Sequence, residues 1–334
     1  MDSFGLKQIF QLARNFKRFV AMEQQRSWKN GIFRPDLLAR GFFSQRARLY
    51  PLDEYDPSLF LNDWKIEFQI SKLNERAVQA FLSNKLLFHF FLREQFPEGV
   101  TAGLIGIVVD DNFVSFSSLR RMEDALADAG FLIAKPIAGA GGKSVHRIVS
   151  LPHGLGRGMF VVESGIRQHP YASSIHPHCV NTIRVLTLKD PDTGQHFIAG
   201  AAHRFGTQRT GCVDNFGRGG LSALVDIETG ILSAAKSNPG FYPCDRHPRH
   251  CDSGAAIEGV SVPYWQQAKD LCIKVTTAIP GMVHVGWDVA ITADGPVIVE
   301  GNARIANPNL IQAHRPLLTN PRIRRFYEYH GVLP

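Results

Sequence analysis

The sequence predicts an α+β protein in which a mainly helical N-terminal region precedes a strand-rich remainder. Three observations support this fold class. Residues 4–28 carry apolar side chains at helical spacing, and residues 104–226 contain several short apolar runs separated by turn-forming residues. Residues 284–304 alternate between apolar and polar side chains on both sides of a turn signal, which is typical of a β-hairpin.

Length and composition indicate a protein with a substantial core. At 334 residues and 44% hydrophobic, the chain is long enough for one multi-lobed unit or two to three subdomains. The net charge of +7 suits anionic ligands such as nucleotides or phosphosugars, and equally nucleic acid or an anionic membrane surface. Because the basic residues are scattered and no aromatic-basic stripe occurs, we expect no nucleic-acid partner.

Several features favour a soluble cytoplasmic protein. Cysteines are sparse and odd in number, which indicates a reducing compartment: Cys179, Cys212, Cys244, Cys251 and Cys272. Basic residues interrupt the first twenty positions, so we expect no secretory signal. Since no run approaches eighteen apolar residues, we also expect no transmembrane segment.

The helix predicted over residues 4–28 is amphipathic and basic. Its stripe consists of Leu6, Ile9, Phe10, Ala13, Phe16 and Val20, with lysines and arginines elsewhere on the wheel. Such a helix binds a membrane surface or a partner, or it docks on its own domain, and we favour docking. Residues 30–64 contain several glycines and prolines and are predicted to be irregular, and residues 66–94 are predicted to form one or two helices.

The middle of the chain alternates short strands with two helices. Helices are predicted at residues 117–129 and 263–278, and residues after the hairpin are predicted to be helical. Strands are predicted at residues 104–109, 131–136, 144–150, 160–163, 182–188, 197–205 and 221–226.

The hairpin at residues 284–304 is expected to separate polar from apolar side chains. One face carries His284, Asp288, Glu300, Asn302 and Arg304. The other face is predicted to enter the core with Val285, Trp287, Val289, Ile291, Val297 and Val299.

A hairpin centred on Asp294 would place Asp288 directly opposite Glu300, and Gly286 opposite Asn302. Two carboxylates facing each other across a ladder repel, and a hard divalent cation bound by carboxylate and amide oxygens removes that repulsion. We therefore favour a metal site. The alternative is a solvated polar face with Arg304 as counter-ion.

Residues 131–144 combine a strand, a lysine and a glycine-rich loop. Glycines allow backbone N–H groups to converge on phosphate oxygens. The loop is not a Walker A motif, because Ile137 stands where that motif needs its first glycine. Lys135 ends an apolar strand, where it either reaches water or meets an anion. Lys85, in a strongly apolar helix, is a second candidate for phosphate binding, and its alternative is a surface lysine.

The order of these features resembles the ATP-grasp superfamily, in particular its sugar-transfer-associated branch. The resemblance covers residues 80–330. Its most specific parts are the segments at residues 181–184 (Asn-Thr-Ile-Arg), 214–220 (Asp-Asn-Phe-Gly-Arg-Gly-Gly) and 287–302.

The resemblance implies an ATP-grasp fold, in which two α+β subdomains clasp ATP, after a mainly helical N-terminal region at residues 1–80. Residues 81–166 would form the lid subdomain, with the phosphate loop and the adenine hinge. Residues 167–334 would form the C-terminal subdomain, with the metal-binding hairpin. The parallel-sheet domain with which the superfamily usually begins is not evident in residues 1–80, so the acceptor substrate stays open.

The resemblance also implies roles for individual residues. Lys85 and Lys135 would contact the ATP phosphates, and Glu163, Ser164 and Ile166 would belong to the adenine hinge. The phosphate loop would contribute Gly139, Gly141, Gly142 and Ser144, and magnesium would be bound by Asp288, Glu300 and Asn302. Catalysis is assigned to Arg184, Arg204 and Arg304, because arginine stabilises the oxygens of a transferring phosphoryl group. For Arg184 and Arg204 the alternative is a structural salt bridge.

The activity implied is an ATP-dependent carboxylate–amine ligase that acts through an acyl phosphate and releases ADP and phosphate. Its cofactors would be ATP and Mg²⁺, and its partners small-molecule carboxylate and amine substrates, including sugar-linked ones. The alternatives are a small-molecule kinase on the ATP-grasp fold and a non-catalytic nucleotide-binding regulator.

The residues Cys244, His247, His250 and Cys251 form a group of soft metal ligands. Zinc ligands are usually paired two to four residues apart, whereas His250 and Cys251 are adjacent. We therefore expect no zinc here, and favour a substrate-facing loop with His247 or His250 in contact with the ligand.

Overall fold

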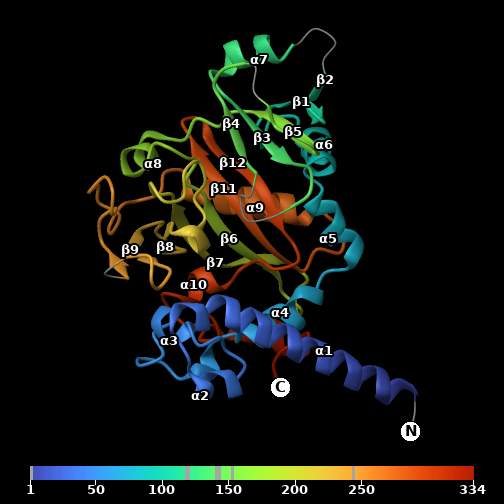
Figure 1. The fold of residues 1–334 in the computed structure, drawn as a ribbon, viewed down its shortest axis with the longest axis vertical. Coiled ribbons are helices and arrows are strands. Elements are labelled where there is room, and N and C mark those ends of the chain that lie inside the picture. Colours follow the sequence, from blue (N-terminus) through green and yellow to red (C-terminus); the bar gives the residue numbers. More distant parts are fainter. Residues whose placement is uncertain (1–2, 117–120, 140–143, 152–153, 243–244) are drawn as a thin grey trace.

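The computed structural model describes residues 3–116, 121–139, 144–151, 154–242 and 245–334. The side chains of residues 3–6 also lie outside this description. Figure 1 shows strand-rich middle and C-terminal parts above a group of helices formed by the N-terminal region. The phosphate-loop residues Gly141 and Gly142 lie outside the described residues.

The N-terminal region is mainly helical, as predicted. Its α-helices are α1 (Ser3–Arg26), α2 (Pro35–Ala39), α3 (Arg46–Leu49) and α4 (Asp63–Phe68). Helix α5 (Arg76–Ser83) crosses the predicted boundary at residue 80, and α6 (Lys85–Gln95) follows it. Residues 30–64 were predicted to be irregular but contain α2, α3 and the start of α4. The breakers in this stretch begin helices rather than preventing them, since Pro35 occupies the first turn of α2 and the Asn62 side chain accepts from the Lys65 N–H.

The smaller sheet has five antiparallel strands in the order β2-β1-β5-β3-β4. The strands are β1 (Leu104–Val109), β2 (Asn112–Ser115), β3 (Leu132–Pro136), β4 (His146–Ile148) and β5 (Met159–Ser164). Helix α7 (Met122–Ala129) covers this sheet and contributes Ala125 to its core. Strand β2 was not predicted, because its turn is made by Asp110 and Asp111, which both adopt positive φ (47° and 66°) without a glycine.

The larger sheet has seven antiparallel strands in the order β10-β9-β8-β7-β6-β11-β12. They are β6 (Ile183–Lys189), β7 (His196–Phe205), β8 (Leu221–Val225), β9 (Leu232–Ser237), β10 (Arg246–His247), β11 (His284–Thr292) and β12 (Gly295–Asn302). All seven strands predicted outside the hairpin are found within two residues of their predicted bounds. The prediction missed β2, β9, β10 and helix α8 (Pro170–Ile175).

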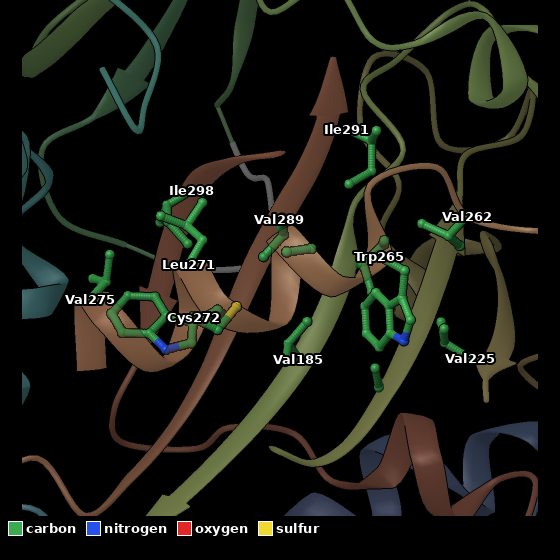
Figure 2. Packing of buried hydrophobic residues seen from close by; sticks show 14 of the residues in the cluster. Val185, Val225, Val262, Trp265, Leu271, Cys272, Val275, Val289, Ile291 and Ile298 are labelled. Atoms are coloured by element: carbon green, nitrogen blue, oxygen red, sulfur yellow. The ribbon is translucent and has the colours of Figure 1, made fainter. Parts of the chain in front are cut away.

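Alternate residues of the larger sheet enter two separate cores. On one face, Val185 and Val289 pack with Cys272 of α9 (Trp265–Thr277), as Figure 2 shows. On the other face, Leu186 packs with Phe326 of α11 (Pro321–Tyr329) and with residues of α4 and of α10 (Asn309–Gln312). The N-terminal region therefore shares a core with the larger sheet. The domain boundaries at residues 80 and 166 stay a prediction.

The hairpin of β11 and β12 has the predicted pairing at its functional end, with Asp288 opposite Glu300 and Gly286 opposite Asn302. Near the turn, however, Thr292 pairs with Gly295 and Val289 with Ile298, so one extra residue, Val299, sits in a β-bulge.

Because of this bulge, the predicted core face is wrong along β12. Val285, Trp287, Val289 and Ile291 are buried there as predicted, but Val297 and Val299 are half-buried and belong to no core. Ile298 takes their place, fully buried, because the extra residue reverses the alternation along β12.

Contrary to the sequence prediction, the apolar stripe of α1 does not dock at Ile9, Phe10, Ala13 and Phe16, and the helix is anchored by a residue outside that stripe. Phe19 is 4% exposed and stacks on Phe43, which anchors the C-terminal part of the helix. Ile9, Phe10 and Phe16 remain 59–72% exposed. Among the described residues, no helix has the length and apolar character needed to cross a membrane.

We expect Gly286→Ala to destabilise the protein by about 1–3 kcal/mol, because a Cβ there would lie 2.5 Å from the Ala306 carbonyl oxygen. A backbone atom cannot rotate away as a side chain can. Urea denaturation of the purified variant measures the loss. Gly154→Ala is the matched control, since a Cβ at Gly154 meets nothing within 4 Å. Equal stability of the two variants would contradict this packing.

Candidate active site

A cavity of about 1250 Å³ is lined by residues from both sheets and from the N-terminal helices. It collects most of the residues that the sequence singled out. Those lining it are Lys85, Lys135, Gly139, Ser144, Glu163, Ser164, Ile166, Arg184, Arg204, Asp288, Glu300 and Asn302. These residues are far apart in the chain, so the fold creates one candidate site from separate segments.

Two arginines from neighbouring strands hold the Asp288 carboxylate. The Arg184 Nε and Nη2 atoms lie 2.6 and 3.1 Å from its two oxygens, and Arg204 Nη2 lies 2.9 Å away. Burial alone would raise the pKa of Asp288, but the two guanidinium groups outweigh burial and hold this pKa well below its ordinary value. Asp288 is therefore ionised and fixed in place.

Arg204 is itself held by a second carboxylate. Its guanidinium contacts Asp214 at 3.3 Å and the Thr182 hydroxyl, and Thr182 donates from its N–H and hydroxyl to Asp214 at 2.8 and 2.6 Å. Burial would lower the pKa of Arg204, yet the surrounding carboxylates, Asp214 first, raise it above its ordinary value. The arginine stays charged and closely positioned at the base of the cavity.

Glu300 and Asn302 face the same cavity from β12, as their pairing with β11 requires. Burial raises the pKa of the Glu300 carboxyl, and the nearby Asp288 charge raises it further. The repulsion expected from sequence is thus present and only partly relieved. Two carboxylates and an amide oxygen form the donor set that hard divalent cations prefer. The residues present therefore fit a magnesium ion.

Lys135 meets an anion of the protein itself. Its Nζ lies 2.6 Å from Glu163 Oε2, and the other Glu163 oxygen is hydrogen-bonded to His89 Nε2 at 2.7 Å. Burial would raise the pKa of Glu163, but Lys135 and the bond to His89 lower it to about 2. Lys135 thus couples β3 to β5 at the edge of the cavity.

Lys85 lies at the first turn of α6, where Asn84 caps the helix by accepting from the Leu87 N–H. The Lys85 Nζ donates to the Gly139 carbonyl at 3.0 Å, which ties this lysine to the start of the glycine loop. Burial lowers its pKa, whereas the charge of Glu300 raises it. The helix start and the lysine therefore direct positive charge into the cavity from the same place.

Some predicted site residues lie elsewhere. Arg304 is exposed and lines a separate, smaller cavity beside α1, because the chain leaves the sheet after Asn302. The structure therefore does not bring Arg304 to the site. His247 and His250 are buried, hydrogen-bonded to Ser237 and to the Gly206 carbonyl, and neither lines the cavity. The substrate-contact interpretation of these histidines is wrong.

Sequence reasoning missed the part of the cavity built by the N-terminal region. The lining residues from that region are Gln25, Arg26, Asn30, Gln45, Arg46, Leu49 and Glu67. They have no shared spacing or motif, so no local signal could have found them. Asn307 and Asn309 also line the cavity. They follow closely on the hairpin, so their proximity to Asn302 was a signal that could have been used.

The chain belongs to the family described as sugar-transfer associated ATP-grasp, which matches residues 148–314, half of the chain. This confirms the predicted superfamily and branch. The α+β, ATP-grasp fold class with a helical N-terminal region is confirmed as well. A comparison with curated proteins finds no match.

Solved structures of several enzymes are similar to this chain at low identity. N5-carboxyaminoimidazole ribonucleotide synthetase from Thermotoga maritima is 11% identical, with a TM-score of 0.37 over 68% of this chain and 43% of that one. D-alanine–D-alanine ligase from Bacillus anthracis, complexed with ATP, is 9% identical, with a TM-score of 0.44 over 80% of this chain and 76% of that one. The chain thus spans less than half the length of the Thermotoga enzyme.

We expect Lys135→Met to destabilise the protein without any ligand by about 3–5 kcal/mol, since it leaves a buried carboxylate without its cation. The double variant Lys135→Met with Glu163→Gln should recover a substantial part of that loss. Urea denaturation at neutral pH measures both. Equal losses in the single and double variants would show that Lys135 does not stabilise Glu163.

The ion pair between Lys135 and Glu163 also predicts how the stability of the protein depends on pH. The folded-state pKa of Glu163 is lowered from 4.5 to about 2, so its stabilising contribution is present above about pH 4.5 and is lost as pH falls toward 2. The substitution Lys135→Met removes the cation that lowers the pKa of Glu163, so this pKa rises in the folded variant. The variant should therefore lose less stability than the wild type over that range.

Proposed function

We propose that this chain is an ATP-dependent carboxylate–amine ligase that activates its carboxylate substrate as an acyl phosphate. The main observation behind the proposal is that a group of acidic and amide side chains and a pair of lysines line the same cavity. Asp288, Glu300 and Asn302 approach from the larger sheet, and Lys85 and Lys135 approach from α6 and β3. The acidic and amide group would bind a divalent cation, and the lysines would bind the negatively charged triphosphate.

The nucleotide would lie between the two sheets. We place its phosphates beside Lys85, Lys135 and the segment that begins at Gly139, and its adenine along the end of β5 from Glu163 to Ile166. Ser164 is held there by a hydrogen bond from the Gly103 N–H to its hydroxyl oxygen at 2.9 Å. A fixed backbone at the strand end supports recognition of a flat base by main-chain groups.

Asp288, Glu300 and Asn302 would hold magnesium. When bound, the ion would neutralise phosphate charge and act as a Lewis acid on the transferring phosphoryl group. The protein contributes position: Arg184 and Arg204 keep Asp288 ionised and aimed into the cavity. Arg204, anchored by Asp214, would also stabilise the oxygens of the transferring phosphoryl group.

The chemistry would be direct phosphoryl transfer to the substrate. A substrate carboxylate oxygen attacks the γ-phosphorus, the bond to the β–γ bridging oxygen breaks, and ADP leaves. An amine then attacks the acyl carbon, phosphate leaves, and the amine loses a proton. Burial raises the pKa of the Cys179 thiol far above its ordinary value, so this cavity cysteine is not a ready nucleophile.

The N-terminal region would form the acceptor side of the cavity. Apart from Leu49, its lining residues are amides and charged groups, including Asn30, Gln45 and Arg46, which suit a polar small molecule. Carboxylate and amine substrates, including sugar-linked ones, and a cytoplasmic location belong to the same proposal.

We expect Glu300→Gln to weaken Mn²⁺ binding in the presence of a non-hydrolysable ATP analogue, and to lower turnover by about 100-fold or more, because a metal ligand and a charge are lost together. Electron paramagnetic resonance titration measures binding independently of activity. Asp294→Asn is the matched control, since it removes an exposed carboxylate from the turn of the same hairpin. Unchanged Mn²⁺ affinity in Glu300→Gln would exclude the metal site.

The products of the reaction separate the ligase from its alternatives. We expect ADP and phosphate, and a hydroxamate when hydroxylamine replaces the amine, because an acyl phosphate can be intercepted. A stable phosphorylated product without hydroxamate would indicate a kinase. Release of AMP and pyrophosphate would contradict phosphoryl transfer altogether, and nucleotide binding without turnover over a panel of acids and amines would indicate a regulator.

A further inference from the structure

The N-terminal half of α1 presents an apolar surface to solvent. Ile9, Phe10, Leu12 and Phe16 are 59%, 72%, 59% and 62% exposed. At about 100° per residue, Ile9, Leu12 and Phe16 form one continuous stripe with Phe10 beside it. Figure 1 shows this half of the helix reaching beyond the body of the molecule.

The polar side of the same helix faces the protein. Gln11, Arg14, Asn15 and Arg18 line the smaller cavity between α1 and the body, together with Glu67. Arg18 lies 3.9 Å from Glu67, and the Gln11 and Asn15 side chains are hydrogen-bonded to each other at 2.7 Å. On the helical wheel, the side that faces the protein is centred on Asn15 and Phe19 and only borders the stripe, whereas an ordinary surface helix buries its apolar stripe.

The orientation of α1 is fixed by its C-terminal part. Phe19 packs between Phe43 and Trp64, and the buried Glu23 accepts hydrogen bonds from the Ser27 hydroxyl and the Ser44 N–H. These contacts prevent the helix from rotating its stripe inward without breaking a buried hydrogen-bond network. The outward face is therefore a property of the folded protein.

The charge around the stripe is of one sign. Between Ser3 and Met22 the sequence contains Lys7, Arg14, Lys17 and Arg18, all exposed, and no aspartate or glutamate. Lys17 falls on the edge of the stripe, beside Phe10, and Lys7 and Arg14 lie beyond it. Aromatic and aliphatic residues flanked by cations are typical of helices that lie in the headgroup region of a membrane.

We propose that the outward face of α1 binds an anionic membrane surface, with the helix lying in the plane of the headgroups. The exposed side chains would enter the acyl boundary, and Lys7 and Lys17 would contact anionic headgroups. A second copy of this chain fits less well, because two such helices side by side would bring Lys7 and Lys17 of both copies together, and residues 3–22 contain no carboxylate to pair with them.

This surface is connected to the proposed catalytic cavity by a single helix. Gln25 and Arg26, in the last turn of α1, line that cavity. A helix of 24 residues is about 36 Å long. Membrane binding would therefore hold the cavity within that distance of the lipid surface.

Vesicle flotation of the full chain tests the proposal. We expect binding to vesicles of phosphatidylcholine mixed with phosphatidylglycerol, little binding to pure phosphatidylcholine, and weaker binding at high salt. The triple variant Ile9→Gln, Phe10→Gln and Phe16→Gln should bind at least about tenfold more weakly, since three exposed apolar side chains are removed. Its fold and thermal stability should be unchanged, because these residues are solvent-exposed.

Two further variants make the result specific. Lys7→Gln with Lys17→Gln should reduce binding to the anionic vesicles while keeping the apolar stripe. Tyr329→Gln, which removes a side chain 61% exposed on the surface of α11, should bind like the wild type. Equal binding of the wild type and the triple variant would overturn the proposal. So would a dimer in sedimentation analysis that the triple variant makes monomeric, without vesicle binding by either protein.

Discussion

The arrangement of the candidate site depends on the charge balance around Asp288. Two carboxylates face each other across β11 and β12, and such a pair destabilises a ladder unless cations oppose it. Arg184 and Arg204 supply that charge from the neighbouring strands β6 and β7, and Asp214 in turn anchors Arg204. The acidic hairpin can form a wall of the cavity because arginines on other strands of the same sheet keep Asp288 ionised and fixed.

Much of this site was accessible from sequence because its determinants are local. Alternation on both sides of a turn gave the pairing of Asp288 with Glu300, although the bulge at Val299 has to offset a turn one residue shorter than the one predicted. Lys135 at a strand end was enough to anticipate a nearby anion. The identity of that anion was not accessible. Glu163 lies on a strand that is not adjacent in sequence, and its pairing with Lys135 follows from the order of strands in the smaller sheet.

The N-terminal region shows a different limit of sequence reasoning. Periodicity correctly grouped the apolar residues of α1 on one face, but it says nothing about which face meets the protein. The orientation of α1 is set by Phe19 and Glu23, which contact Phe43 and Ser44 more than twenty positions later in the chain. The same long-range packing brings Asn30 and Arg46 to the cavity, although no motif joins them to the hairpin.

The bulge at Val299 separates two registers within β12. From the turn to Ile298 the ladder runs in one register and from Glu300 onward in another, so Ile298 faces the core while Glu300 and Asn302 face the cavity. A strand that paired regularly from the turn with every residue retained would place Val299 opposite Asp288 and Glu300 opposite Trp287, and the acidic face would be lost. Deleting Val299 alone would instead give a regular ladder in which Glu300 still lies opposite Asp288. A relative with a strand one residue shorter can therefore carry the same acidic face, and an alignment matches the two correctly only when the gap stands at Val299.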